Sequence, residues 1–185
     1  MSNIRISCLE RVRDVAVEWN ATHVVSLLDP DIRVEDIPKF SEGVEHRCFF
    51  FYDEDDSPDG SEFGSHLESV LRYLHAGPLR DASNRLVVHC HAGASRSPAL
   101  FYVLLCQELG PGREQEAFGV LLKATVKPWP NRQLVAVADQ MLGRDGKMLA
   151  PLDSYRLRYP KRIQAYRRLN TKRGILSKRG LTPCA

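Results

Sequence analysis

The residues best placed to do chemistry are a cysteine and an arginine six positions apart, Cys90 and Arg96. A short β-branched and apolar run, Arg85 to His89, precedes the cysteine, and small residues fill most of the interval. Pro98 suits the first turn of a helix, where its missing N–H costs nothing. A strand-to-helix turn of small residues aims successive backbone N–H groups and a helix N-terminus at one point. The pattern therefore predicts an anion-binding loop.

The same loop would activate the thiol of Cys90. A phosphate or sulfate group would lie among backbone N–H groups while Arg96 contacts two of its oxygens. These positive groups favour the thiolate form of Cys90, which is the nucleophilic form. Ser97 would add a hydroxyl hydrogen bond to the sulfur. The predicted phosphate-binding residues are Arg96 and the loop interior, which consists of His91, Ala92, Gly93, Ala94 and Ser95.

The run HCHAGASRSPA, residues 89–99, resembles the signature loop of the cysteine-dependent protein tyrosine phosphatase superfamily. It is most similar to the small dual-specificity type, in particular its bacterial members. In that family a Cys and an Arg flank five residues, with His before and Ser or Thr after, which matches His89, Cys90, Arg96 and Ser97. The resemblance covers about residues 20–142. It implies hydrolysis of phosphate monoesters through a phosphocysteine intermediate, with no metal or organic cofactor.

The resemblance also implies a general acid, an Asp just beyond a strand upstream of the loop. Asp53 fits best because it directly follows the apolar run RCFFFY. Its spacing of 37 residues to Cys90 is a little long for the family, so Asp55, and less readily Asp56 or Asp59, stays an alternative. The same carboxylate would later activate the water that hydrolyses the intermediate.

Three further residues near the loop invite a supporting role. His89 and His91 flank the cysteine and could suggest metal ligands. Adjacent strand positions point to opposite sides, however, and no second ligand pair in the sequence has the spacing of a structural zinc site. We therefore predict no metal site. We expect His89 to be buried and to shape the loop, whereas the role of His91, which would line the pocket, stays open. Pro130-Asn131 resembles the family's turn before its last core helix, where Asn131 would brace the active-site loops; Asn131 is equally suited to cap that helix.

The rest of the chain alternates strand and helix patterns. We expect strands at residues 4–7, 22–28, 47–52 and 85–89, with an amphipathic stretch after the first strand up to residue 19. We expect helices at residues 62–75, 97–109, 113–125 and 131–142. This alternation indicates an α/β fold with a central, mostly parallel sheet flanked by helices. Residues 47–52 and 85–89 form short apolar runs between polar residues, which predicts buried strands.

The composition is that of an ordinary soluble protein, with 43% hydrophobic and 26% charged residues in a chain of 185. No apolar run approaches the length of a membrane span, and the first residues lack the layout of a secretion signal. The five cysteines are an odd number, which favours reduced thiols. We therefore expect a cytoplasmic protein.

Charge divides the chain unevenly. Residues 1–142 carry a net charge of −7 and residues 143–185 a net charge of +10, so we predict a phosphatase domain at 1–142 and a basic C-terminal extension at 143–185. Apolar side chains recur in the extension at about helical spacing, at Tyr155, Tyr159, Ile163 and Tyr166, with Pro160 as a break or helix start. This pattern favours a helix packed on the acidic body. Docking of RNA or a membrane surface is the alternative.

The sequence leaves the substrate open. A phosphorylated protein is the expected partner, either phosphotyrosine alone or with dual specificity, and the loop has no Lys at positions 91, 92 or 94 to favour a phosphoinositide. RNA 5′-phosphatase activity also occurs in the family that the loop resembles, and the basic C-terminal segment keeps it as an alternative. Two other classes compete: a non-catalytic phosphate-binding module, and a rhodanese-like sulfurtransferase, whose loop usually lacks the His-Cys and Arg-Ser framing.

Overall fold

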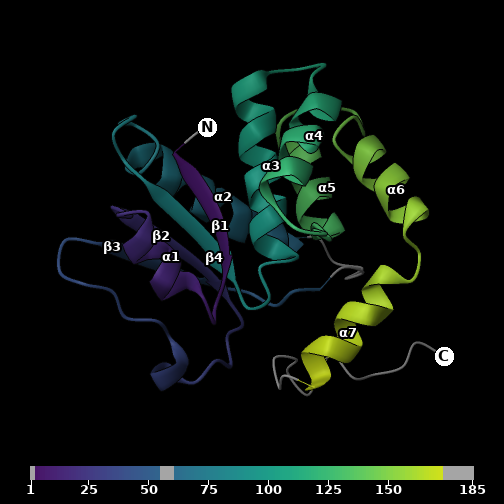
Figure 1. Cartoon of the computed structure of the whole chain (residues 1–185). Helices are drawn as coiled ribbons and strands as arrows, with labels where there is room; N and C mark the ends of the chain where they lie inside the picture. Colours follow the sequence, from purple (N-terminus) through teal and green to yellow (C-terminus); the bar gives the residue numbers. More distant parts are fainter. Residues whose placement is uncertain (1–2, 55–60, 173–185) are drawn as a thin grey trace.

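Four parallel strands form the centre of the fold in the part of the chain that the structure, a computed structural model, describes, residues 3–54 and 61–172 (Figure 1). They are β1 (Ile4–Cys8), β2 (His23–Leu28), β3 (Glu45–Phe50) and β4 (Leu86–Cys90). Their spatial order is β1-β4-β2-β3, and all pairs are parallel. Every residue of β4 is buried because it lies between β1 and β2. The chain therefore leaves the middle of the sheet at Cys90.

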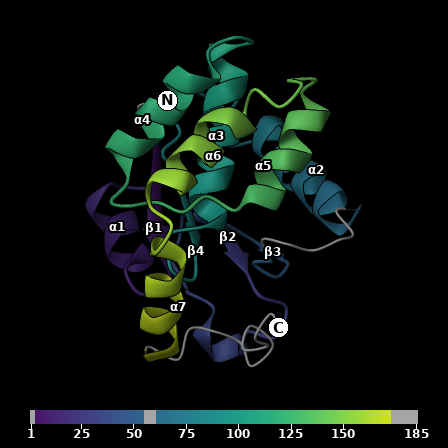
Figure 2. The ribbon, with the colours of Figure 1, turned by 90° about the vertical axis from the view of Figure 1, so that its right-hand side faces the viewer.

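Helices cover both faces of the sheet. Helix α1 (Val12–Glu18) packs on one face, while α2 (Ser61–Ala76) and α3 (Arg96–Leu109) pack on the other. Helices α4 (Glu114–Ala124), α5 (Arg132–Met141) and α6 (Leu149–Arg158) gather around α3, and α7 (Arg162–Lys172) follows them (Figures 1 and 2). A single 3-10 turn, Val34–Asp36, lies in the connection between β2 and β3. Among the helices of the described ranges, none has the length and apolar character needed to cross a bilayer.

The α/β class and the parallel sheet predicted from the sequence are confirmed, with one correction at β3. The run Arg47–Tyr52 reads as a buried strand, but the strand begins two residues earlier, at Glu45, and none of its residues is buried. The physical reason is its place at the edge of the sheet, where only β2 pairs with it. Phe50 is 41% exposed there, so the prediction of a buried strand is wrong although the run is apolar.

The segment after residue 142 shares the core of the sheet domain. Met148, Leu152 and Tyr155 belong to the same buried cluster as the residues of β4 and α3. Arg144 pairs with Glu114 at 3.2 Å, and both side chains are almost fully buried. Farther along, the hydroxyl of Tyr166 on α7 donates a hydrogen bond to the carbonyl of Lys127.

Two leucines of α6 test whether this segment contributes to the stability of the domain. Leu152 is fully buried, whereas Leu157, in the same helix, is 81% exposed. Leu152→Ala should lower the free energy of unfolding by about 2–5 kcal/mol because it leaves a cavity, and Leu157→Ala should change it by less than about 0.5 kcal/mol. Urea unfolding of the whole chain measures both. Equal, small effects would mean that the segment is dispensable to the core.

Candidate active site

The predicted anion loop joins the centre of the sheet to the most buried helix. Cys90 ends β4 and is 1% exposed, and Arg96 begins α3. The Cys90 sulfur lies 3.3 Å from the hydroxyl oxygen of Ser97, in the first turn of that helix. The fold thus brings a buried thiol, a hydroxyl and the N-terminus of α3 together at one place.

Neighbouring segments hold the loop by its carbonyl groups. The backbone N–H of Leu9 donates to the carbonyl of His91 at 3.0 Å, and that of Trp129 donates to Ala94 at 2.7 Å. Asn131 N–H donates to the carbonyl of Ser95 at 3.3 Å. With these carbonyls bound to the surrounding structure, the loop is shaped as a nest whose N–H groups suit an anion.

Gly93 allows the tight path of this loop. Its φ of +66° lies in the left-handed region, and a Cβ at this position would come within 2.8 Å of the carbonyl oxygen of Ser7. Both the dihedral angle and the close approach of two backbones exclude a larger residue.

The guanidinium of Arg96 is buried beside the loop. Its Nη1 donates a hydrogen bond to the carbonyl of Phe51 at 2.5 Å and lies 2.8 Å from Oδ1 of Asp29. Its Nε faces Oδ2 of Asp53 at 3.7 Å and, within the described residues, has no hydrogen-bond partner. Buried donors nearly always have an acceptor. Arg96 Nε is therefore suited to donate to the oxygen of a bound anion.

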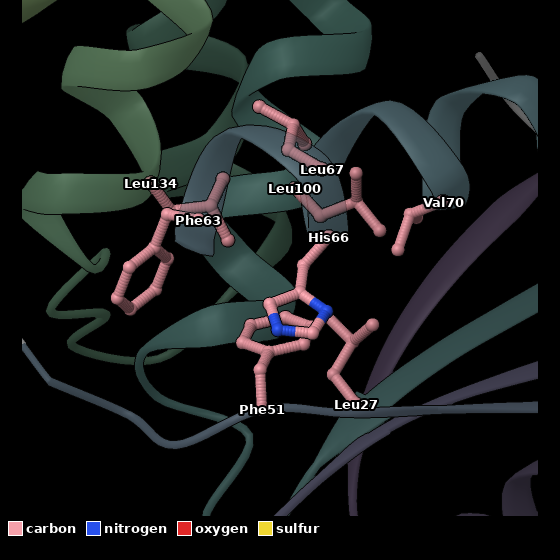
Figure 3. Close-up of a pocket in the computed structure, with 8 residues that line it drawn as sticks. All are labelled: Leu27, Phe51, Phe63, His66, Leu67, Val70, Leu100 and Leu134. Atoms are coloured by element: carbon pink, nitrogen blue, oxygen red, sulfur yellow. The ribbon is translucent and has the colours of Figure 1, made fainter. Parts of the chain in front are cut away.

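Phe51, which holds Arg96, is itself fixed by an apolar cluster. Figure 3 shows a narrow hollow behind the Phe51 ring, where His66 stacks on it with ring centroids 5.3 Å apart. The Phe63 ring meets the other side edge-on at 5.9 Å. The remaining lining is aliphatic and comes from Leu27, Leu67, Val70, Leu100 and Leu134. Packing between β2, α2, α3 and α5 thus sets the position of the carbonyl that orients Arg96.

Asp53 lies on the loop after β3 and faces the anion site. Its Oδ1 accepts hydrogen bonds from Ser95 Oγ at 2.7 Å and from Asn131 Nδ2 at 2.8 Å. Its Oδ2 is the oxygen turned toward Arg96. About a third of the side chain is exposed, so the carboxyl group can exchange protons with solvent. The alternatives Asp55, Asp56 and Asp59 lie outside the described residues.

Asn131 makes both of the contacts considered for it. Its side-chain oxygen accepts from the N–H of Leu134 at 2.8 Å and caps α5. Its Nδ2 donates to Asp53 and, at 3.0 Å, to the carbonyl of Glu54. The cap and the brace are compatible because they use different atoms of one fully buried amide.

His89 points to the side of the sheet opposite Cys90. Its Nε2 lies 2.5 Å from Ser26 Oγ, which in turn lies 2.7 Å from Nε2 of His46. Burial lowers the pKa of His89 to about 3, so the ring is neutral at physiological pH. Its Nδ1 approaches the carbonyl of Cys90 at 3.4 Å. The ring supports the strand end beneath the nucleophile.

Asp29 is a site residue that the sequence analysis did not single out. Asp29 directly follows β2 and is buried between Arg96 and His91, with Oδ2 3.3 Å from His91 Nδ1. The sequence holds only half of the signal for it, namely its place directly after a strand; the other half is which strand lies beside that one. The carboxyl ends of neighbouring parallel strands meet at one edge of a sheet, where α/β proteins bind ligands. An acid directly after β2 therefore lies beside the loop that follows β4, because the two strands are neighbours in the sheet.

Comparisons with known proteins give structural neighbours only, since no family model and no curated protein sequence matches the chain. The crystal structure of human DUSP28 aligns with a TM-score of 0.59 at 16% identity, covering 77% of this chain and 90% of that one. Human tyrosine phosphatase-like serine/threonine/tyrosine-interacting protein aligns with a TM-score of 0.57 at 18% identity, and the alignment covers 76% of this chain and 91% of that one. The PTP-2 phosphatase of Cydia pomonella aligns with a TM-score of 0.56 at 21% identity, and the alignment covers 76% of this chain and 86% of that one.

The chain has the fold of the small dual-specificity phosphatases. The tyrosine-phosphatase-like architecture implied by the signature loop is therefore confirmed. At 15–21% identity these phosphatase neighbours establish the fold, and the chemistry has to be argued from the residues of the site.

A pair of glycines tests the geometry of the loop. Gly93→Ala should lower the free energy of unfolding by about 2 kcal/mol or more, because it combines a left-handed φ with a backbone clash. Gly119→Ala, inside α4 with open space around it, should raise it by about 0.5–1 kcal/mol. Urea unfolding compares the two variants. An unperturbed Gly93→Ala protein would show that the loop does not pass this close to β1.

Proposed function

We propose that the chain hydrolyses phosphate monoesters through a phosphocysteine intermediate. The observation that carries the proposal is the arrangement around Cys90: a buried sulfur beside Ser97 Oγ, at the start of a loop whose Arg96 has a buried donor with no partner among the residues that the structure describes. Such a site binds a tetrahedral oxyanion directly above a nucleophile.

In the first step the Cys90 thiolate attacks phosphorus and the bond to the ester oxygen breaks. Arg96 and the loop N–H groups hold the three equatorial oxygens as charge develops on them. Asp53 donates its proton to the departing oxygen, so an alcohol or phenol leaves rather than an alkoxide or phenoxide. The products of this step are the free alcohol and S-phosphorylated Cys90.

In the second step water attacks the phosphocysteine. The Asp53 carboxylate accepts a proton from that water, phosphate forms, and the thiolate leaves with a hydrogen bond from Ser97. The geometry supports Asp53 in both roles because Ser95 and Asn131 fix one of its oxygens while the other faces the anion site. Neither step calls for a metal or an organic cofactor.

The substrate we propose is a phosphorylated protein, on tyrosine alone or with dual specificity. Within the loop the only side chain with a titratable charge besides Cys90 and Arg96 is His91, so the loop is less suited to the several phosphates of a phosphoinositide. The four cysteines described, Cys8, Cys48, Cys90 and Cys106, are free thiols. They suit work in the reducing cytoplasm, which we propose as the location.

The decisive experiment is hydrolysis of para-nitrophenyl phosphate from about pH 4.5 to about 8, with reductant and EDTA. Cys90→Ser should abolish turnover, since no phosphocysteine can form. Asp53→Asn should lower kcat by about 10²–10⁴-fold and remove the high-pH limb of the profile.

Matched controls keep the interpretation specific. Cys106→Ala removes another buried cysteine, one whose pKa burial raises to about 12, and should leave kcat unchanged. Asp36→Asn removes an exposed carboxylate paired with Arg33 and should do the same. Loss of kcat in Asp55→Asn, Asp56→Asn or Asp59→Asn in place of Asp53→Asn would reassign the acid. A wild-type protein that binds vanadate without turnover would be a binding module.

A further inference from the structure

The side chains of His91, within the anion loop, and Asp29, beside it, form a carboxylate–imidazole pair that has no part in the steps above. The His91 ring presents Nδ1 to Asp29 Oδ2 at 3.3 Å, and the other oxygen of Asp29 lies 2.8 Å from Arg96 Nη1. The His91 and Asp29 side chains are 14% and 11% exposed, so water screens neither of them well. Asp29 thereby lies between Arg96, the fixed cation of the site, and His91, whose ring can gain or lose a proton.

The site has too few positive charges for its proposed ligand. Arg96 is the one permanently charged cation among its described side chains, and it faces two carboxylates, Asp29 and Asp53. A phosphate ester dianion adds two negative charges, and the Cys90 thiolate adds one more. A second cation beside the loop would stabilise this group of charges strongly, because electrostatic interactions are strong at low exposure.

His91 is the titratable side chain in position to supply that cation. Burial, together with the charge of Arg96, lowers its pKa from the usual value, against the opposing effects of Asp29, Asp53 and Asp31. The ring is therefore mostly neutral near pH 7 when the loop is empty. A bound dianion acts in the same direction as the carboxylates and favours the protonated ring.

We propose that His91 takes up one proton when an oxyanion binds to the loop, so that the phosphate site gains its second cation only when it is occupied. The inference rests on the proposed function, because it assumes that the loop binds phosphate. It makes His91 a substrate-binding residue, with Asp29 as its positioning partner. The affinity for the dianion then decreases with rising pH.

No other group facing His91 accounts for such a pH dependence. Asp29 and Asp31 follow β2, and Asp53 follows β3; carboxyl groups ordinarily titrate below about pH 5. Arg96 on α3 stays charged throughout. The neighbouring His89 on β4 titrates only at about pH 3. Cys90 is the remaining titratable group, and its replacement by serine removes it from the measurement.

Tungstate binding to Cys90→Ser protein, followed by calorimetry from about pH 6 to about 8.5, tests the proposal. Tungstate stays a monomeric dianion over this range when it is kept dilute enough not to condense, so the protein is titrated into dilute tungstate; phosphate would change its own charge. Between the pKa values of His91 in the empty and occupied site, the dissociation constant should rise about tenfold per pH unit. Buffers of different ionisation enthalpy should report the uptake of up to one proton per tungstate.

Three further substitutions in the same Cys90→Ser background make the test specific. His91→Asn should bind weakly and with no pH dependence, and His91→Lys should bind with no pH dependence but at the tight limit, since its charge is permanent. His75→Asn removes an exposed imidazole on α2 and should keep the full pH dependence and the proton uptake.

The outcomes separate this inference from the proposed function. Tight tungstate binding without proton uptake, or proton uptake that persists in His91→Asn, overturns the role of His91 and leaves the phosphate site intact. No tungstate binding at any pH, in a protein that unfolds cooperatively, overturns the phosphate site itself and the inference with it.

Discussion

The structure depends above all on how it accommodates a buried guanidinium. Arg96 is 1% exposed, and a charge so far from water needs partners at close range. The carbonyl of Phe51, the carboxylate of Asp29 and, more distantly, that of Asp53 supply them. They come from the ends of β2 and β3, so the order of the parallel strands is what brings them to one edge beside Cys90. Within the described residues, the Nε of Arg96 has no hydrogen-bond partner and can donate to a ligand.

This constraint also explains which parts could be predicted from the sequence. Cys90, Arg96 and Ser97 are local: their spacing, the small residues between them and Pro98 define a strand, a turn and a helix within ten positions. These local signals need no knowledge of which strands are neighbours. The placement of Asp53 beside the loop was expected from the family resemblance, and its position directly after an apolar run singled it out among the nearby acids.

What could not be predicted depends on neighbours in space. Asp29 becomes part of the site only because β2 lies next to β4, and the order of strands is not written in either segment. The exposure of β3 is a similar case, since an edge strand with apolar residues resembles a central one. The partners of the loop carbonyls, Leu9 and Trp129, are likewise remote from it in sequence.

The C-terminal helices are connected to the same site through the backbone of residues 127–131. Tyr155 donates to the carbonyl of Pro128 at 2.8 Å, and Arg156 donates to that of Pro130 at 2.6 Å. The N–H groups of Trp129 and Asn131, in the same stretch, hold the carbonyls of the anion loop. Basic side chains of this segment also contact aromatic rings: the guanidinium carbon of Arg162 lies 3.9 Å from the centre of the Tyr159 ring. Tyr155 and Arg156 thus contact the stretch whose N–H groups in turn hold the anion loop, and they do so through hydrogen-bond donors at fixed positions rather than through the net charge of the segment.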